Sequence, residues 1–359
     1  MSKDFFGEQV SSYLMALMQK VAQDKGKDSP DYKALYYQYI RTDAEKDNMR
    51  EQNSRHYEAA VSNENLGLRY IERLYKRQAT IILTSACNAH CRYCLRQNYA
   101  DMCVQEDDIT QITFYLANDI YLKEVLITGG DPLLATEKLI YLMQRIINEA
   151  PNIRIIRIGT RLPVQNPKNL DKRILEFFFA NKEKVFFEIA LQVNHIVELQ
   201  SEAQSCIDEI RKSGVTMYAQ NVLLKNVNNS MNALVELYDA LRYQHIEAHY
   251  LFHPVPIRRT AHFRMPLYEF LMFARELTAS GEIPGRSKPM FSLMTDVGKC
   301  TLYEGTILGQ AEEGVYEICT SYRLHERQKW NSEYRLPASA RMAENGTIIV
   351  KYLDGAEEE

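Results

Sequence analysis

The sequence predicts an α/β protein built on a partial barrel of parallel strands. From about Thr80, short apolar runs alternate with longer amphipathic stretches, beginning with ATIILTS, ITQITFYLAND, EVLITGG, EKLIYLMQRIINEA and IRIIRIG. This alternation is typical of strands followed by helices, and about six such units precede the point near Pro284 where the pattern weakens. Because active sites of such barrels lie at the carboxyl ends of the strands, polar residues directly after strand-like runs are the first functional candidates.

Two extensions flank the expected barrel, which we assign to residues 76–300. Residues 1–75 are polar and helix-like, with Pro30 as their only proline, and predict an N-terminal helical extension. Residues 301–359 contain the strand-like runs TLYEGTILG, GVYEICTS and GTIIVKYL and predict a short β-rich extension with a mobile acidic tail.

Composition excludes several classes of function. The 359 residues are 46% hydrophobic, enough for a large core, and the net charge of −4 does not favour a nucleic-acid partner. The sequence has no secretory signal pattern and no apolar run near the roughly 18 residues of a membrane helix, so we expect a cytoplasmic protein. Three of the seven cysteines fall within eight positions, which favours metal binding over a disulfide framework.

The crowded cysteines are Cys87, Cys91 and Cys94, directly after an apolar strand. Spacings of three and then two residues let one loop bind three corners of a [4Fe–4S] cluster, leaving the fourth iron open. An open iron can chelate the amino and carboxylate groups of S-adenosylmethionine (SAM) for reductive cleavage to a 5′-deoxyadenosyl radical. The alternatives are a zinc site or inert cysteines, although zinc needs four ligands, and His90 and Cys103 stand at unfamiliar spacings.

With its flanks, the loop TSACNAHCRYCLRQNYA resembles the cluster loop of the lysine 2,3-aminomutase family of radical SAM enzymes. Further matches follow in the same order: VLITGGDPLLAT, IRIIRIGTRLPV, IALQVNH, SGVTMYAQNVLLKNVN and AHFRMP, so that the resemblance covers roughly residues 70–310. It implies a partial (β/α)6 TIM-like barrel of the radical SAM type. It also implies an isomerase that moves an amino group between adjacent carbons with the help of pyridoxal 5′-phosphate (PLP).

The resemblance implies a SAM-binding role for three segments. Gly129, Gly130 and Asp131 match the segment that contacts the methionine amino group, although alone they would predict a strand-to-helix turn capped by Asp131. Tyr93 matches an aromatic residue near the adenine, with a core position as the alternative.

The strand ends supply the remaining SAM and substrate candidates. Arg157 and Arg161 are of the type that clamps carboxylates, with an ordinary ion pair as the alternative. Gln192 and His195, together with Asn194, match a segment that faces the SAM and substrate pocket. Arg96 matches the arginine that binds the α-carboxylate of an amino-acid substrate.

Lys299 is the candidate for the covalent attachment of PLP, because it follows a strand and a glycine as the family's lysine does. The loop before it is shorter than in the family, and a surface lysine is the alternative. Asp296, in the same loop, is a candidate substrate-binding residue. Arg73 and Arg77 have the spacing of the family's phosphate-binding pair but are shifted by one position.

The segment HPVPIRRTAHFRMP predicts the charge of the substrate side chain. Lysine-specific members place an aspartate upstream of the matching segment, where this chain has Arg258 and Arg259. A buried ammonium beside guanidinium groups is unfavourable, so we expect an acidic or neutral substrate side chain. The family's C-terminal zinc cysteines are missing, since Cys319 stands alone.

We therefore expect a PLP-assisted radical SAM 2,3-aminomutase, supplied with electrons by a donor such as flavodoxin or ferredoxin. One alternative is a PLP-independent radical SAM epimerase, dehydrogenase or other rearranging enzyme; another is a zinc-binding interaction or nucleic-acid module. Enzymes of this family tend to form homo-oligomers, so the resemblance makes a homo-oligomer one possible state of this chain.

Overall fold

The alternating runs after Thr80 form one curled sheet with helices outside it. The computed structural model of the chain describes residues 7–46, 70–98 and 104–355. In these ranges the larger sheet has nine strands, which follow each other in sequence order from β1 to β9. Strands β2 to β8 are parallel, and an antiparallel strand flanks each edge, β1 beside β2 and β9 beside β8.

The strands of this sheet are β1 (Ile71–Glu72), β2 (Gln78–Thr84), β3 (Glu124–Gly129), β4 (Ile155–Thr160), β5 (Phe186–Leu191), β6 (Thr216–Val222), β7 (Glu247–Phe252), β8 (Met290–Thr295) and β9 (Gly298–Thr301). The helices that follow its strands are α4 (Glu106–Asn118), α5 (Thr136–Glu149), α6 (Leu162–Gln165), α7 (Lys172–Asn181), α8 (Ser201–Lys212), α9 (Met231–Tyr243) and α10 (Leu267–Ala279). Short 3₁₀ helices are η1 (Asp43–Lys46), η4 (Leu95–Asn98), η5 (Pro132–Leu134), η6 (Pro167–Asn169), η7 (Ile196–Glu198), η8 (Ala261–Phe263) and η9 (Gly285–Ser287).

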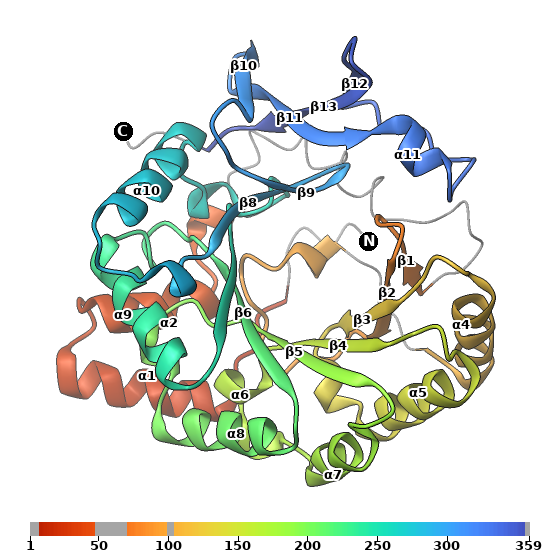
Figure 1. Cartoon of the computed structure of the whole chain (residues 1–359). Coiled ribbons are helices and arrows are strands. Elements are labelled where there is room, and N and C mark those ends of the chain that lie inside the picture. The colour runs from red at the N-terminus through yellow and green to blue at the C-terminus, as the bar shows by residue number, and fades with distance from the viewer. Residues whose placement is uncertain (1–6, 47–69, 99–103, 356–359) are drawn as a thin grey trace.

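Six of the parallel strands, β2 to β7, are each followed by a helix before β8 begins. Figure 1 shows the helices on the convex side of the sheet, which curls around an interior. This arrangement confirms the predicted partial (β/α)6 barrel.

The two faces of the sheet differ in polarity, because successive side chains of a strand point to opposite sides. Outward-facing residues such as Ile127, Ile158 and Ile189 join the main apolar core beneath the helices. The positions between them include Glu124 and Arg157, whose side chains face the inside of the curl. The concave side can therefore hold a polar site, which we call the lumen.

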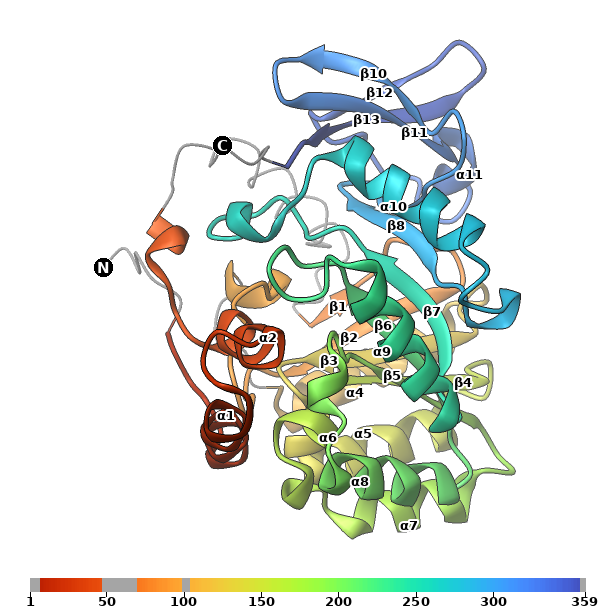
Figure 2. The same cartoon turned by 90° about the vertical axis from the view of Figure 1, so that its left-hand side faces the viewer.

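Two helices of the N-terminal extension pack beside the barrel (Figure 2): α1 (Ser12–Lys25) and α2 (Pro30–Tyr39). The Ser11 and Ser29 hydroxyls accept backbone hydrogen bonds at their N-termini, and Pro30 occupies the first position of α2, where a missing N–H costs nothing. The buried faces of both helices form a second apolar core with the cysteine loop. Residues 1–6 and 47–69 of this extension lie outside the described residues.

The C-terminal residues form a second, antiparallel sheet of β10 (Ile307–Glu312), β11 (Val315–Arg323), β13 (Thr347–Leu353) and β12 (Ala340–Met342), with α11 (Leu324–Gln328) after β11. It lies beside the β8–β9 hairpin (Figure 1). The Tyr322 hydroxyl donates to the Lys299 carbonyl at 2.6 Å, and Arg264 donates to the Asp354 carbonyl at 2.6 Å. The boundaries at 75/76 and 300/301 stay predictions, and the acidic tail, residues 356–359, lies outside the described residues.

None of the helices in the described ranges has the length and apolar character that a membrane crossing requires.

Candidate active site

The three cysteines of the predicted cluster loop follow β2. Cys91 is buried, and Cys87 and Cys94 are partly buried. Burial and the charges of the neighbouring cysteines raise the pKa of Cys87, and burial and Cys91 raise the pKa of Cys94 to about 11. Three thiolates so close together repel one another, and bound iron would relieve that repulsion.

The cysteine loop suits a cluster whose irons each take one thiolate. Within residues 7–46, 70–98 and 104–355, no three His, Cys, Asp or Glu side chains are grouped to hold a single metal ion. A cubane binds its three thiolates at three different irons, so the sulfurs need not converge on one point. The donor set therefore fits the expected [4Fe–4S] cluster.

Gly129 and Gly130 let the end of β3 approach the cysteine loop. Backbone N–H groups of Gly130 and Asp131 donate to the carbonyls of Thr84 (2.5 Å) and Ala86 (2.7 Å). A Cβ at Gly129 would lie 2.2 Å from the Thr84 oxygen, and one at Gly130 would lie 2.2 Å from the Ala86 oxygen. The close approach that requires glycine is therefore made to the cysteine loop itself.

Asp131 is a capping residue rather than a free contact for SAM. Its buried carboxylate accepts the Thr160 hydroxyl at 2.8 Å and the backbone N–H groups of Arg161 and Leu162 at 2.9 and 2.8 Å. Burial nevertheless raises the pKa of Asp131. The carboxylate is occupied by the turn that it caps, and the contact of this segment with the methionine amino group stays a prediction.

Arg161 lies at the centre of a buried polar cluster, which we call the Arg161 network: Gln38, Tyr39, Tyr93, Arg161, Gln165, Asn194 and Glu198. Its guanidinium donates to Cys91 Sγ at 3.0 Å and to the Tyr93 hydroxyl, and it pairs with Glu198. Burial alone would lower the pKa of Arg161, but the negative charges of Cys91 and Glu198 hold it well above its usual value. The guanidinium binds the protein's own groups, and the expected role of Arg161 in binding a cofactor stays a prediction.

Tyr93 belongs to the same network, and its expected place beside adenine stays a prediction. Its hydroxyl accepts from Asn194 Nδ2 at 2.6 Å, and its ring packs edge-on against Phe263 with centroids 6.0 Å apart. The ring is only 6% exposed. The structure favours the alternative of a core tyrosine that supports the cysteine loop from behind.

The N-terminal segment wraps the same loop. Gln9 Nε2 donates to the Cys87 carbonyl at 2.6 Å, and the Gly7 carbonyl lies 2.8 Å from His90 Nδ1. Arg92 forms a buried ion pair with Glu45, with Nε–Oε1 and Nη2–Oε2 distances of 2.8 and 2.5 Å. Both side chains are at most 1% exposed. The extension is therefore part of the wall of the site.

The segment after β5 contains three candidate residues, of which one faces the lumen and two bind other parts of the protein. Gln192 continues the inward-facing alternation of β5 and stays a candidate for the SAM pocket. His195 is buried, its Nδ1 accepts the Val197 N–H at 3.2 Å, and burial lowers its pKa. His195 therefore caps η7, and its expected contact with SAM stays a prediction. Asn194 binds within the Arg161 network.

A second polar cluster occupies the lumen, and we call it the Lys299 group: Tyr75, Glu124, Arg157, Glu188, Tyr218, His249, Tyr250 and Lys299. Arg157 Nε donates to Glu188 at 3.0 Å, its Nη2 lies 3.6 Å from Glu124, and its guanidinium lies over the Tyr218 ring. The structure thus gives Arg157 the ion pair that was the alternative to a carboxylate clamp. It nonetheless faces the lumen.

Lys299 reaches the lumen from the opposite edge of the sheet. Its ammonium lies 4.7 Å from the centroid of the Tyr250 ring and 5.6 Å from that of Phe252. Burial and the charge of Arg157 lower the pKa of Lys299 to about 8. The Tyr75 hydroxyl accepts the Lys299 N–H at 2.9 Å and fixes the hairpin. Lys299 is therefore not the surface lysine of the alternative interpretation.

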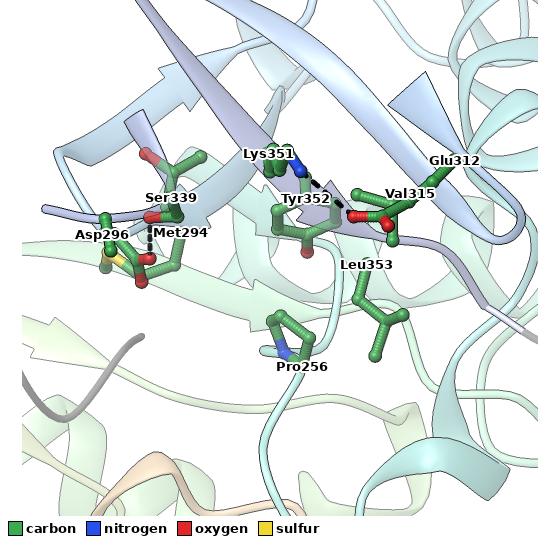
Figure 3. Close-up of a pocket in the computed structure, with 11 residues that line it drawn as sticks. Pro256, Met294, Asp296, Glu312, Val315, Ser339, Lys351, Tyr352 and Leu353 are labelled. Atoms are coloured by element: carbon green, nitrogen blue, oxygen red, sulfur yellow. Dashed lines mark hydrogen bonds and ion pairs between the residues drawn. The ribbon is translucent and has the colours of Figure 1, made fainter. Parts of the chain in front are cut away.

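Asp296 is separated from Lys299. Its buried carboxylate accepts the Ser339 hydroxyl in a pocket of about 170 Å³ between the β8–β9 hairpin and the C-terminal sheet (Figure 3). Neither Lys299 nor a cluster cysteine lines this pocket. The structure does not bring Asp296 together with the other substrate candidates.

The remaining arginines lie at different places. Arg96 is 3.6 Å from Glu72, on the open edge of the sheet, and the Arg258 carbonyl accepts Gln97 Nε2 at 3.0 Å. Arg258 is exposed and Arg259 is half-buried, with a left-handed φ of 68° in the same turn. These residues stay substrate candidates.

The two phosphate candidates are corrected. Arg73 is buried in an ion pair with Asp119, it donates to Tyr115 at 2.7 Å, and its guanidinium lies over the Trp330 ring. Arg77 is exposed. Neither belongs to the Lys299 group.

Sequence reasoning missed much of both clusters. Glu198 stands three residues after His195, a capping-box spacing that could have been recognised. Glu124 and Glu188 are charges within otherwise apolar strand runs, which indicates a polar inner face. Gln38 and Glu45 leave no local signal, because their partners are distant in sequence.

Comparisons with known proteins agree with this geometry. A family model described as a 4Fe-4S single cluster domain matches residues 76–173. A protein of Aquifex aeolicus provisionally named L-lysine 2,3-aminomutase is 30% identical over 229 residues, which are 63% of this chain and 60% of that protein. The L-lysine 2,3-aminomutase of Buchnera aphidicola is 28% identical, with coverages of 53% and 56%, and that of Escherichia coli is 27% identical, with coverages of 56% and 59%. The chain spans roughly three fifths of the length of these relatives.

Two solved structures are distantly similar. Streptococcus suis SuiB bound to S-adenosylmethionine has a TM-score of 0.47 and 15% identity, covering 67% of this chain and 54% of that one. A radical SAM methyltransferase from Sphaerobacter thermophilus has a TM-score of 0.45 and 16% identity, covering 63% and 69%. Both scores are below 0.5, so the fold assignment rests on strand order alone.

A partial (β/α)6 barrel with a three-cysteine cluster loop after its first parallel strand defines the radical SAM class of enzymes. The iron–sulfur family match favours this class over the zinc module. Within it, the chain is similar to proteins named as lysine 2,3-aminomutases, which agrees with the resemblance seen in the sequence.

Proposed function

We propose that the chain is a PLP-assisted radical SAM aminomutase that moves the α-amino group of an amino acid to its β-carbon. The observation that supports this proposal most is the position of Lys299. Its ammonium lies in the lumen, against Tyr250 and Phe252, with a pKa lowered to about 8. A lysine that is partly neutral near physiological pH is the type that attaches a carbonyl cofactor.

Separate parts of the chain would hold the two cofactors. Cys87, Cys91 and Cys94 would bind the cluster, and Gln192, directly after β5, would contact SAM. When bound, the cluster and SAM supply the radical that removes a substrate hydrogen, and PLP holds the migrating nitrogen. Lys299 would hold PLP through Nζ, and the rings of Tyr250 and Phe252 lie beside that nitrogen.

The substrate side chain is proposed to be acidic or neutral. Arg96 is retained for the α-carboxylate, and its proximity to Glu72 keeps it near the inner face of β1 and β2. Arg258 and Arg259 stand in a turn whose backbone is hydrogen-bonded to the 3₁₀ helix that contains Arg96. Guanidinium groups there would repel a substrate ammonium. A screen of amino acids in which only lysine reacted would contradict this assignment.

The attachment of PLP is tested directly by chemistry. The protein is reconstituted anaerobically with iron, sulfide and PLP, reduced with borohydride, and digested for peptide mass spectrometry. We expect a phosphopyridoxyl adduct on Lys299, its loss in Lys299→Arg, and its retention in Lys172→Arg, a change of an exposed lysine. An unlabelled Lys299 in a protein that still cleaves SAM would exclude the aminomutase and leave radical chemistry.

A second candidate is a PLP-independent radical SAM epimerase, dehydrogenase or rearranging enzyme. One observation favours it: Arg73 is committed to Asp119 and Arg77 is exposed, so the family's phosphate-binding pair has no counterpart beside Lys299. The borohydride experiment separates the two candidates.

A small-molecule substrate agrees with both candidates. Three further proposals are a flavodoxin or ferredoxin donor, a cytoplasmic location and a homo-oligomer. Activity with each reduced donor tests the first, cell fractionation the second, and sedimentation the third.

A further inference from the structure

We infer that Arg161 is a positioning residue that sets the reduction potential of the cluster through a hydrogen bond to the Cys91 thiolate. This inference rests on the cluster proposed at the three cysteines and is independent of PLP and of the substrate. It concerns the Arg161 network, none of whose donors is used by the proposed reaction itself.

Two buried donors reach the same sulfur. Arg161 Nη1 lies 3.0 Å from Cys91 Sγ, and Gln165 Nε2 lies 3.3 Å from it. Arg161 is 6% exposed and Gln165 is 2% exposed, so water does not compete for these hydrogen bonds. Reduction adds negative charge to a cluster, and N–H donors to its sulfurs stabilise the reduced state.

The guanidinium is held in one orientation. Nη2 donates to Gln38 Oε1 at 3.1 Å and pairs with Glu198, while the plane lies over the rings of Tyr39 and Tyr93 at 5.2 and 5.6 Å. A long side chain held by hydrogen bonds at both Nη1 and Nη2 loses little further freedom when an N–H points at the sulfur. The donor is therefore already oriented before the cluster changes charge.

Glu198 limits the effect of the arginine's positive charge. Its Oε1 accepts from Tyr39 at 2.9 Å and pairs with Arg161, while Oε2 accepts the backbone N–H groups of Asn194 and His195 at 2.7 and 3.1 Å. Because the charges of Glu198 and Arg161 largely cancel at a distance, the directed hydrogen bond dominates. Loss of the acid would leave a positive charge next to the cluster.

The test is a redox titration of the reconstituted protein, followed by electron paramagnetic resonance of the reduced cluster. Arg161→Gln and Gln165→Leu should both shift the midpoint potential to more negative values, the first by more. Glu198→Gln should shift it in the positive direction. The exposed Arg286→Gln serves as the control and should leave the potential unchanged.

Midpoint-potential shifts of opposite sign in Arg161→Gln and Glu198→Gln separate an electrostatic role from general damage to the site. General damage would not change the sign of the shift between these two variants. If Arg161→Gln loses its cluster, the midpoint potential of Gln165→Leu tests the inference instead, because this change removes a hydrogen bond to Cys91 without removing a charge. Unchanged potentials in variants with full iron content would overturn the inference. A protein that binds no cluster at all, even unmodified, would instead contradict the proposed function.

Discussion

The Arg161 network and the Lys299 group are both polar clusters inside one barrel, but they are built differently. In the first, the charges of Arg161 and Glu198 are enclosed by hydrogen bonds from helices, loops and the N-terminal extension. In the second, Arg157 sits between two carboxylates on strand faces that border the lumen, and Lys299 faces them with a lowered pKa. A network whose charges are paired internally supports a cofactor, whereas one with a reactive amine can receive a ligand.

The sharpest way to break this comparison is to remove a cluster ligand. Cys91→Ser should abolish the cluster, because the two remaining thiolates cannot hold a cubane. The Arg161 network should still keep the loop in place. Iron and sulfide analysis with visible absorbance measures the loss. Cys319→Ser, on β11, is the matched control and should keep full iron content. An intact cluster in Cys91→Ser would refute the ligand assignment.

The enclosure of the cysteine loop by the N-terminal segment is tested by Glu45→Ala. This change removes the carboxylate that pairs with the fully buried Arg92 charge and should cost about 3–5 kcal/mol of unfolding free energy. Urea denaturation measures it. Asp43→Ala, in an exposed ion pair with Lys46, should leave the denaturation midpoint unchanged. Equal effects of the two changes would show that the extension does not brace the loop.

The reactive character of the lumen is tested by pH. The pKa of Lys299 falls from 10.5 to about 8 on folding, so between these values the unfolded chain binds more protons and stability rises with pH. Below pH 8 the cost of the buried charge is complete. Lys299→Met should remove this rise and stabilise the protein at pH 7 by up to about 3 kcal/mol.

Denaturation series between pH 7 and 10.5 measure this effect, with the exposed Lys172→Met as the control. A slope that survives in Lys299→Met would mean that the amine is not held in a low-dielectric site.

The smallest expected effect concerns the close contact between the end of β3 and the cysteine loop. Gly130→Ala places a Cβ 2.2 Å from the Ala86 oxygen and should cost about 1–3 kcal/mol, with a partial loss of bound iron. Gly285→Ala, which meets nothing within 4 Å, is the control. Thermal unfolding and iron content measure both, and a full iron content in Gly130→Ala would show that the loop tolerates displacement.

Local sequence signals predicted the barrel, because the strand–helix alternation is a property of neighbouring residues, and the structure confirms it. The cysteine spacing is also a local signal, and the assignment of Cys87, Cys91 and Cys94 as cluster ligands stays a prediction. The cap at Asp131 and the ion pair at Arg157 were recognisable as the ordinary alternatives, since such side chains bind nearby backbone or strand neighbours.

The rest depends on contacts between distant residues. Gln38 and Arg161 are 123 positions apart, and no pattern in either segment indicates the other. The lumen position of Lys299 depends on how the β8–β9 hairpin closes the sheet edge, which a motif does not specify. For the same reason Asp296, in the same short turn, lies in a different pocket.

The wrapping of the cysteine loop by the N-terminal segment also affects the order of folding during synthesis. Gly7 and Gln9 contact residues 78 to 85 positions later, and Tyr39 waits for Glu198, 159 positions away. This segment leaves the ribosome before the barrel and therefore has no docking surface until most of the barrel has emerged. Such non-local closure is slow, and it leaves the cysteine loop open for iron delivery before the extension covers it.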